Sequence, residues 1–374
     1  MPTLVTLALA LALAAPCALS QTFTASPFAG LHEPMIEALL YNPSVSEVTQ
    51  TYPYKRQPDH LKLEPVLHIS GRGLPEGAAT LTYHIEAGEK LLFKGTAEVT
   101  VFKGGILEKE LSLTEKCPEA TRVSYELTAP DRPAVRGYVP LRWSRFRGQV
   151  RYLDGGWRCT YIELHPLGFV SSTTFYVPVK DDGGFDALLP SRVYSVVNVN
   201  GTGYSYDSME RWAWDYDLTH DREDQFTIGR TELYGIHAFN IKGGPRTVFV
   251  AFRPTALSRV LQFDADGDGL VSDEERKKMA AAMKESPTVI GPELEAKDVM
   301  VWIDGRQQTI AQFNKVPEYD GDLWQVQYLL QFYPDQALQP FVWHEIKLEV
   351  RSKETLHGKE VIDFGQGSVG FYPE

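Results

Sequence analysis

The sequence has few cysteines, and this shortage excludes one kind of metal site. Of its three cysteines, Cys17 lies in the apolar N-terminal stretch, which leaves Cys117 and Cys159 for the rest of the chain. Two thiols are too few for a cysteine-rich zinc site. In an exported protein the pair could form one disulfide, or each thiol could be buried separately. The sequence alone leaves these two alternatives open.

Positive charge is also scarce. Lys and Arg number 37 against 49 Asp and Glu, a formal net charge of −12. This charge repels nucleic acid on average, and no clustered basic stripe overrides it. The chain also lacks G-x-S-x-G, H-E-x-x-H and a phosphate-cradling glycine loop, and His220, His237 and His344 lack zinc-ligand spacing. We therefore expect no nucleic-acid partner, and no motif assigns a catalytic residue.

The first twenty residues form an apolar run that ends in A-L-S at residues 18–20. Small residues at the two ends of this tripeptide indicate a signal peptide cleaved between Ser20 and Gln21. A membrane anchor is the competing interpretation, but the apolar core is shorter than the roughly 20 residues that span a bilayer. A lipoprotein site at Cys17 is disfavoured by the preceding Pro16. We expect a secreted, periplasmic or cell-exterior location, with no membrane span in the mature chain.

The composition favours β structure. The chain has 18 Tyr, 18 Phe and seven Trp among many Val and Thr residues, all types enriched in strands. Alternating runs recur at roughly ten-residue spacing with turns between them, which is typical of β-sandwiches. The clearest runs are residues 66–69, 80–85, 96–101, 146–152, 160–164, 194–199, 225–228, 233–239, 247–252, 299–303, 324–329 and 346–350. Residues 34–40 are instead predicted to form a short helix.

The stretch from Phe146 to Tyr204 has a particular order of signals. A strand leads into the turn D-G-G at 154–156, and a second strand is followed by D-x-G-x-F at 181–185, L-P, Y-x-V-x-V and G-Y. This order resembles the small transthyretin-like β-sandwich found as the carboxypeptidase regulatory-like domain. In that family the module is an accessory fold without catalytic residues, so the resemblance implies architecture and not chemistry.

The segment from Asp264 to Glu275 carries the strongest chemical signal. Its sequence, D-A-D-G-D-G-L-V-S-D-E-E, places carboxylates at positions one, three, five and twelve and a glycine at position six. Calcium takes several oxygen ligands in a loose geometry, so carboxylates must converge from a short, tightly turned loop. The segment resembles an EF-hand calcium-binding loop. The resemblance assigns the ligand positions to Asp264, Asp266, Asp268, Leu270 (through its backbone carbonyl), Ser272 and Glu275.

The flanks of this segment agree with a helix-loop-helix arrangement. Leu261 and Phe263 end a stretch that could be the entering helix, and residues 275–284 should form the exiting helix, with Met279 and Met283 on its apolar face. A solvated acidic turn is the alternative, but it does not explain the match along the whole loop. We expect one bound Ca2+ with a structural role, because extracellular modules bind calcium at roughly 10⁻⁴–10⁻³ M rather than at sensor affinities.

Together these patterns predict a mainly β fold: tandem Ig-like and transthyretin-like β-sandwiches with a single helical EF-hand-type calcium segment inserted. The predicted divisions are a signal peptide (1–20), a lead-in segment (21–60), a β-sandwich (61–142), a transthyretin-like or regulatory-like β-sandwich (143–205), further β strands (206–253), the EF-hand calcium-binding segment (254–285) and a C-terminal β domain (286–374).

An aromatic cluster near residue 210 is a second candidate site. Trp212 and Trp214 lie at period two, so a strand would present both on one face, and Tyr204, Tyr206 and Tyr216 flank them among several acids. Aromatic faces beside carboxylates suit sugar recognition, but core packing or an inter-domain contact is the preferred interpretation.

Acids in the same region carry the enzymatic alternative. Asp221, Glu223 and Asp224 could supply a carboxylate pair for glycoside chemistry, although acidic loop runs are usually solvated. The leading hypothesis is an exported multi-domain β-sandwich protein that binds one structural calcium ion and has a non-enzymatic binding or scaffolding role at the cell exterior. The alternative is a secreted glycan-active enzyme with acidic catalytic residues near 207–224. Carbohydrate or another extracellular protein are the candidate partners besides calcium.

Overall fold

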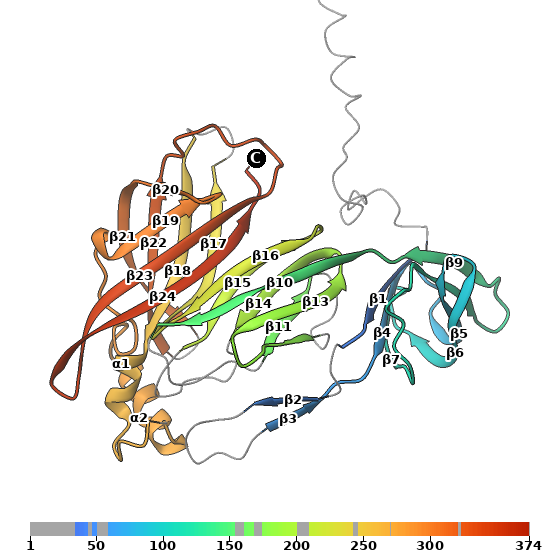
Figure 1. Cartoon of the computed structure of the whole chain (residues 1–374), viewed down its shortest axis with the longest axis horizontal. Helices are drawn as coiled ribbons and strands as arrows, with labels where there is room; N and C mark the ends of the chain where they lie inside the picture. The colour runs from blue at the N-terminus through green and yellow to red at the C-terminus, as the bar shows by residue number, and fades with distance from the viewer. Residues whose placement is uncertain are drawn as a thin grey trace, which may run out of the picture.

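The structure, a computed structural model, is mainly β, as predicted. It describes residues 34–43, 47–50, 59–153, 161–167, 174–199, 209–241, 246–269, 271–320 and 323–373. Within these residues the helical elements are α1 (Leu257–Val260), α2 (Asp273–Met283) and the 3-10 turns η1 (Leu261–Phe263) and η2 (Ala296–Asp298). Every other regular element is a strand, and Figure 1 shows their arrangement.

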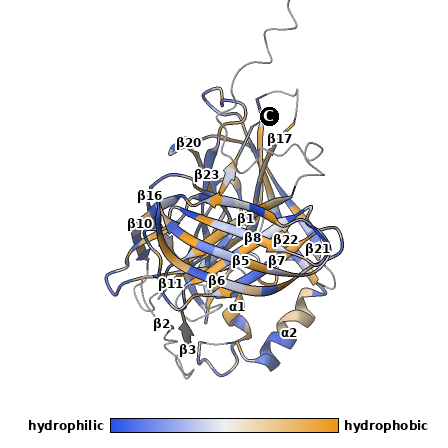
Figure 2. Ribbon diagram, turned by 90° about the vertical axis from the view of Figure 1, so that its right-hand side faces the viewer, coloured by the Kyte–Doolittle hydropathy of each residue, from blue (hydrophilic) through white to orange (hydrophobic). Residues whose placement is uncertain are grey.

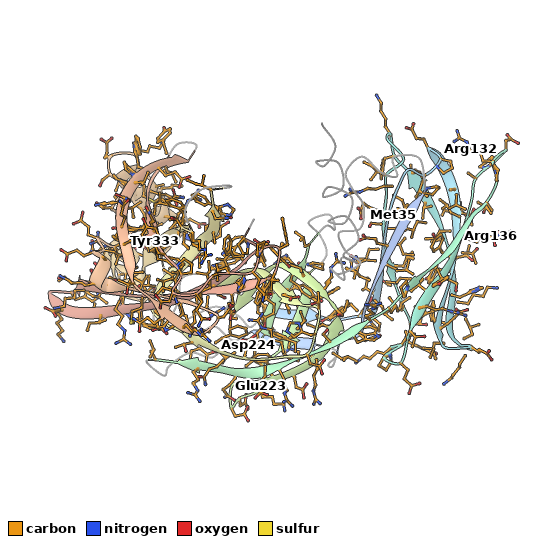
Figure 3. All side chains as sticks on the ribbon, turned by 90° about the horizontal axis from the view of Figure 1, so that it is seen from above. Met35, Arg132, Arg136, Glu223, Asp224 and Tyr333 are labelled. Atoms are coloured by element: carbon orange, nitrogen blue, oxygen red, sulfur yellow. The ribbon has the colours of Figure 1, made fainter. Side chains whose placement is uncertain are left out.

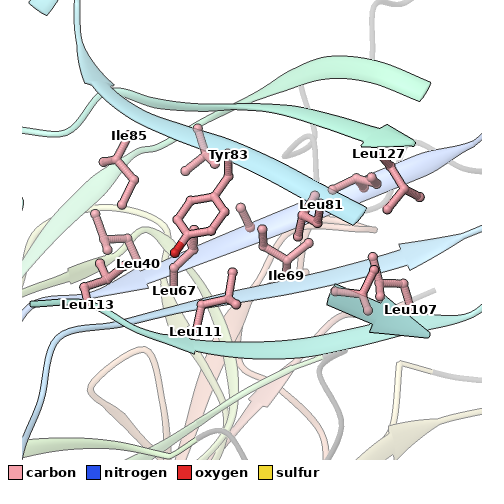
Figure 4. Close-up of a cluster of buried hydrophobic side chains, with 14 of the residues drawn as sticks. Leu40, Leu67, Ile69, Leu81, Tyr83, Ile85, Leu107, Leu111, Leu113 and Leu127 are labelled. Atoms are coloured by element: carbon pink, nitrogen blue, oxygen red, sulfur yellow. The ribbon is translucent and has the colours of Figure 1, made fainter. Parts of the chain in front are cut away.

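The first β unit has two sheets around one core. One sheet has the order β1-β4-β7 and the other β6-β5-β8-β9. These strands are β1 (Met35–Tyr41), β4 (Val66–Arg72), β5 (Gly77–Ala87), β6 (Lys90–Val101), β7 (Leu107–Ser112), β8 (Arg122–Thr128) and β9 (Val135–Pro140). Hydrophobic and hydrophilic residues alternate along β5 (Figure 2). Its inward side chains, including Leu81 and Ile85, pack with Leu67 and Leu107 in a buried cluster (Figure 4). The unit is therefore β-sandwich-like.

Residues 34–40, predicted as a helix, contribute strand β1, which pairs antiparallel with β4. Alternate side chains of β1 enter different cores: Ile36 and Leu40 join the first cluster, whereas Leu39 and Tyr41 join the second. A strand that is buried on both faces reads as a continuous apolar run, without the alternation that marks a strand. The helix prediction was wrong for this reason, and β1 ties the first β unit to the second.

The second buried cluster lies between the sheet β13-β10-β16 and one half of an eight-stranded sheet. The strands of this region are β10 (Trp143–Tyr152), β11 (Tyr161–Pro166), β12 (Phe175–Pro178), β13 (Gly184–Pro190), β14 (Arg192–Val199), β15 (Arg211–Leu218) and β16 (Arg222–Ile228). Phe146, Phe185 and Phe226 pack at its centre, with Phe146 and Phe185 ring centroids 4.7 Å apart. β10 pairs antiparallel with β13 and parallel with β16.

The eight-stranded sheet continues into the C-terminal part of the chain. Its order is β12-β11-β14-β15-β24-β23-β19-β20, and β15 joins β24 in parallel at Ala213↔Ser368. The sheet β17-β18-β22-β21 packs with it around the third cluster. The added strands are β17 (Thr231–Asn240), β18 (Val248–Ala256), β19 (Val299–Ile303), β20 (Arg306–Gln308), β21 (Ile310–Asp320), β22 (Leu323–Phe332), β23 (His344–Leu356) and β24 (Lys359–Phe371). One sheet therefore spans the second and third clusters.

The remaining described strands, β2 (Glu47–Gln50) and β3 (Asp59–Lys62), pair with each other. No helix of the described residues is both long and apolar enough to cross a membrane. The predicted signal peptide, the turn at 154–156, Cys159, Tyr204 and Leu270 lie outside the described residues. The domain divisions also stay predictions, although the structure places β15 and β16, from the predicted segment 206–253, in the sheets around the second cluster.

Candidate functional site

The acidic loop, residues 264–275, lies between two helical pieces at one end of the C-terminal β region. β18 ends at Ala256 and leads directly into α1 and η1, and the last residues of the loop form the first turn of α2. Figure 1 shows α1 and α2 together, beside the turn end of the β23–β24 hairpin. Leu261 is buried in η1, and Met283 is buried on α2 with Met279 half-buried one turn earlier. The predicted exiting helix is therefore present, and the entering piece is two short turns.

Three carboxylates of this loop converge. Asp264, Asp266 and Asp268 each offer an oxygen, and these oxygens lie within 4.8 Å of one another. Asp264 is buried, Asp268 is half-buried and Asp266 is exposed, so the cluster opens to solvent on one side. Three like charges at this separation repel one another. A cation at this position would relieve that repulsion.

The backbone of the loop fixes the first of these carboxylates. Oδ1 of Asp264 accepts hydrogen bonds from the backbone N–H of Gly267 (2.9 Å) and Asp268 (3.2 Å), and its Oδ2 accepts one from Gly269 (2.8 Å). Gly267 and Gly269 have φ of +71° and +81°, which glycine adopts without the Cβ penalty of other residues. The sharp turn predicted at Gly269 is thus present, and it directs three N–H groups at one side chain.

Glu275 closes the loop from the other side. Its Oε1 accepts a hydrogen bond from Ala265 N (2.6 Å), and its Oε2 accepts from Ser272 N (2.8 Å) and Ser272 Oγ (2.7 Å). The bond from the Ala265 amide, followed by those from Ser272, holds the pKa of Glu275 below its usual range. Ser272 is also the N-cap of α2 and completes a capping box with Glu275. From the first turn of α2, Glu275 therefore bonds to Ala265 near the start of the loop and to Ser272 near its end. It is not one of the three converging carboxylates.

The two tryptophans share one face of β15, as predicted, and they are packed rather than open. The rings of Trp212 and Trp214 are stacked with centroids 5.6 Å apart, and Tyr234 of β17 contacts both edge-on at 5.3 Å. Both tryptophans are only partly exposed. Trp212 Nε1 donates to Glu232 Oε1 at 2.8 Å. This packing between β15 and β17 favours the structural interpretation over a sugar platform.

Glu232 was not singled out by the sequence, which shows only an acid in an alternating strand. Its side chain is buried, and its pKa is raised to about 8. Burial is the largest cause and the charge of Glu210 adds to it, while the hydrogen bond from Trp212 acts in the opposite direction. The acid is therefore largely protonated at neutral pH. Only the packing of β17 against β15 brings it to the tryptophans.

The acids proposed for glycoside chemistry are held by other groups. Glu223 forms an ion pair with Arg147 at 2.7 Å, and Asp221 Oδ1 accepts a hydrogen bond from the Arg145 backbone N–H at 2.8 Å. Asp224 accepts from Arg222 Nε at 2.7 Å and from the Tyr216 hydroxyl. Figure 3 places Glu223 and Asp224 on β16 near the middle of the molecule. Each of the three acids therefore has its own partner, and the Glu223–Arg147 pair lies exposed at the surface.

Cys117 is a free, buried thiol, and its amide donates to Asn42 Oδ1 at 2.8 Å. The second cysteine of the predicted alternatives, Cys159, lies outside the described residues. Cys117 forms no disulfide within the described residues, and the predicted alternatives stay open.

Comparison with known proteins adds little to these observations. No family model and no curated protein matches the chain. Among solved structures it is similar to the crystal structure of a DUF3823 family protein from Parabacteroides merdae, at 12% sequence identity and a TM-score of 0.19. The match covers 61% of this chain and 99% of that chain. At this TM-score we draw no conclusion about fold or function from the likeness.

Proposed function

We propose that the protein binds one structural Ca2+ in the acidic loop and acts as an exported, non-enzymatic binding or scaffolding protein at the cell exterior. The observation that carries the calcium proposal is the convergence of Asp264, Asp266 and Asp268 within 4.8 Å. Carboxylate oxygens are the ligands that a hard cation such as calcium prefers, and no sulfur or imidazole group belongs to the cluster. The donor set therefore fits calcium better than zinc or copper.

Five side chains and one backbone group would hold the ion. The side chains are Asp264, Asp266, Asp268, Ser272 and Glu275, and the backbone group is the carbonyl of Leu270. Calcium would supply positive charge at the centre of the acidic loop. The protein would supply a loop whose shape is already set by hydrogen bonds from its own amides to Asp264 and Glu275. Such preorganisation favours binding because less of the chain has to be ordered by the ion.

A structural role is favoured over a signalling role. The loop begins only two short helical turns, α1 and η1, after Ala256, the last residue of β18. Leu257, Val260 and Leu261 of these two turns are buried. An entering element held in this way has little freedom to swing open when an ion binds. The protein would instead use calcium to fasten the loop and α2 to the β region.

The finer architectural and cellular predictions belong to the same proposal. The antiparallel pairs β10–β13, β11–β12, β11–β14 and β14–β15 support a small β-sandwich that includes the region of the transthyretin-like resemblance, residues 146–204, and continues to residue 228 through β15 and β16. Export rests on the N-terminal sequence. The glycan-active alternative has less support, because Asp221, Glu223 and Asp224 are engaged by other groups.

Calcium titration of the full chain tests the calcium proposal. After chelator treatment, calorimetry should show one calcium ion bound per chain, and Asp264→Asn should abolish the heat. Asp273→Asn is a matched control, because Asp273 is an exposed acid of α2 outside the proposed ligand set. The proposal is wrong if the chain gives no calcium heat, or if the two variants weaken binding equally.

A further inference from the structure

We propose that Glu354 and Asp363 of the β23–β24 hairpin are positioning residues for the acidic loop, although neither belongs to it. This inference rests on the proposed calcium binding. Both acids are buried, and both contact α1, the helical turn that leads into the loop. Both lie far beyond α1 in the chain. Glu354 follows its partner Arg259 by 95 residues, and Asp363 follows its partner Ser258 by 105 residues.

Asp363 holds the first turn of α1. Its Oδ2 accepts a hydrogen bond from Ser258 N at 2.8 Å, and its Oδ1 accepts from Ser258 Oγ at 2.8 Å and from Arg230 Nε at 2.9 Å. Asp363 and Ser258 are both fully buried. A buried carboxylate is tolerated only when it is paired and hydrogen-bonded, so the fold constrains all three groups to this arrangement.

Glu354 holds the next residue of α1. Its Oε2 accepts a hydrogen bond from Arg259 Nε at 2.7 Å, and Arg259 also donates to the backbone carbonyl of Thr288, beyond α2, at 2.7 Å. The guanidinium therefore connects three elements: the hairpin, the entering turn of the loop and the segment that follows α2. Both flanks of the acidic loop are fixed through this one side chain.

Apolar packing acts in the same direction. Leu257 of α1 and Leu261 of η1 form a small buried cluster with Met209, and Leu356 at the end of β23 packs against it. A four-residue helix is far shorter than the length at which an isolated helix is stable, so the hairpin contacts and this packing decide where α1 lies. Asp264, which follows η1 directly, inherits its position from them.

The consequence for calcium is a coupling between the hairpin and the site. If one acid loses its charge, α1 samples more orientations, and Asp264 is less often in place to share a cation with Asp266 and Asp268. Calcium binding must then restore the arrangement. The apparent calcium affinity is the intrinsic affinity multiplied by the fraction of time for which the arrangement is present. Groups that orient metal ligands from outside the ligand set typically change metal affinity by 10–100-fold when they are replaced.

The test compares two substitutions on the same strand. Glu354→Gln removes the charge beside Arg259, whereas Glu345→Gln removes a charge that pairs with Arg222 at 2.7 Å near the opposite end of β23. Calcium titration of each full-length variant, by calorimetry after chelator treatment, gives the affinity, and a melting curve without calcium gives the stability. We expect about tenfold weaker calcium binding for Glu354→Gln and unchanged affinity for Glu345→Gln, even if both variants melt earlier.

The outcomes separate this inference from the calcium proposal. An unmodified chain that binds no calcium overturns both. Suppose that the unmodified chain binds calcium. The coupling alone is then wrong if Glu354→Gln binds calcium with the same affinity, or if Glu345→Gln is weakened as much as Glu354→Gln. If Glu354→Gln does not fold, Ser258→Ala replaces it, because this change removes only a hydroxyl, which donates to Asp363 and accepts from Arg230. A weaker calcium affinity in Ser258→Ala supports the coupling, and an unchanged affinity refutes it.

Discussion

Glu232 is an acid that the fold keeps largely protonated at neutral pH, and its replacement by glutamine is expected to stabilise the protein. Its side chain is buried beside Trp212, and burial raises its pKa from 4.5 to about 8. In the unfolded chain the same acid ionises near its ordinary pKa. Between these two values the folded state holds a proton that the unfolded state has released.

The sign and size of the effect follow from this difference. A raised acid pKa contributes stability that is fully present below pH 4.5 and is lost as the pH rises toward about 8. In this window each pH unit lowers the free energy of unfolding by about 1.4 kcal/mol. Between pH 4.5 and pH 7 the ionisation of Glu232 therefore lowers the free energy of unfolding by about 3 kcal/mol. Glutamine keeps an oxygen that can accept the Trp212 Nε1–H bond and cannot ionise. Glu232→Gln should therefore be more stable than the unmodified protein by about 3 kcal/mol at pH 7, and equal to it near pH 4.

Urea unfolding followed by tryptophan fluorescence, at several pH values with the calcium concentration held constant, measures this difference. Glu210→Gln is an informative companion, because the Glu210 charge is one cause of the raised pKa. That variant should lower the folded-state pKa of Glu232, so the loss of stability still begins near pH 4.5 but ends at a lower pH and is smaller. A Glu232→Gln difference that stays constant from pH 4 to pH 8, or a variant that is less stable throughout, would refute the reasoning.

Four further results are expected. Removing calcium should lower the melting temperature, since an ion at 100 times its Kd stabilises the native state by about 2.7 kcal/mol; identical melting curves in chelator and in millimolar calcium would count against the site. In calcium titrations Glu275→Gln should weaken binding more than Ser272→Ala, because it removes a formal charge, whereas water can replace a hydroxyl. Burial lowers the pKa of His68 to about 4, so stability should fall as the pH drops from 6.5 toward 4, by up to about 3 kcal/mol, and His68→Gln should flatten this fall in acid denaturation curves. Trp214→Ala should destabilise by roughly 3–5 kcal/mol in a melting experiment, and loss of polysaccharide retention without loss of stability would contradict the structural interpretation.

The sequence was sufficient for features whose determinants lie close together in the chain. The acidic loop is the clearest case, because its carboxylates and turn glycines occupy a dozen consecutive positions. Local hydrogen bonds and positive φ values then bring Asp264, Asp266 and Asp268 together. Most strands were predictable for a related reason, since the period of two that is visible in β5 is also the period of burial.

Only the tertiary structure decided the features that depend on distant segments. β1 was mistaken for a helix, because its two faces enter two different cores and no local pattern reports that. Glu232 meets Trp212 across β17 and β15, and Asp363 meets Ser258 across 105 positions of the chain. Nothing in the neighbourhood of these acids marks them as buried. Their environment is set by strand register and sheet packing, which are determined by the whole core and not by the residues beside them.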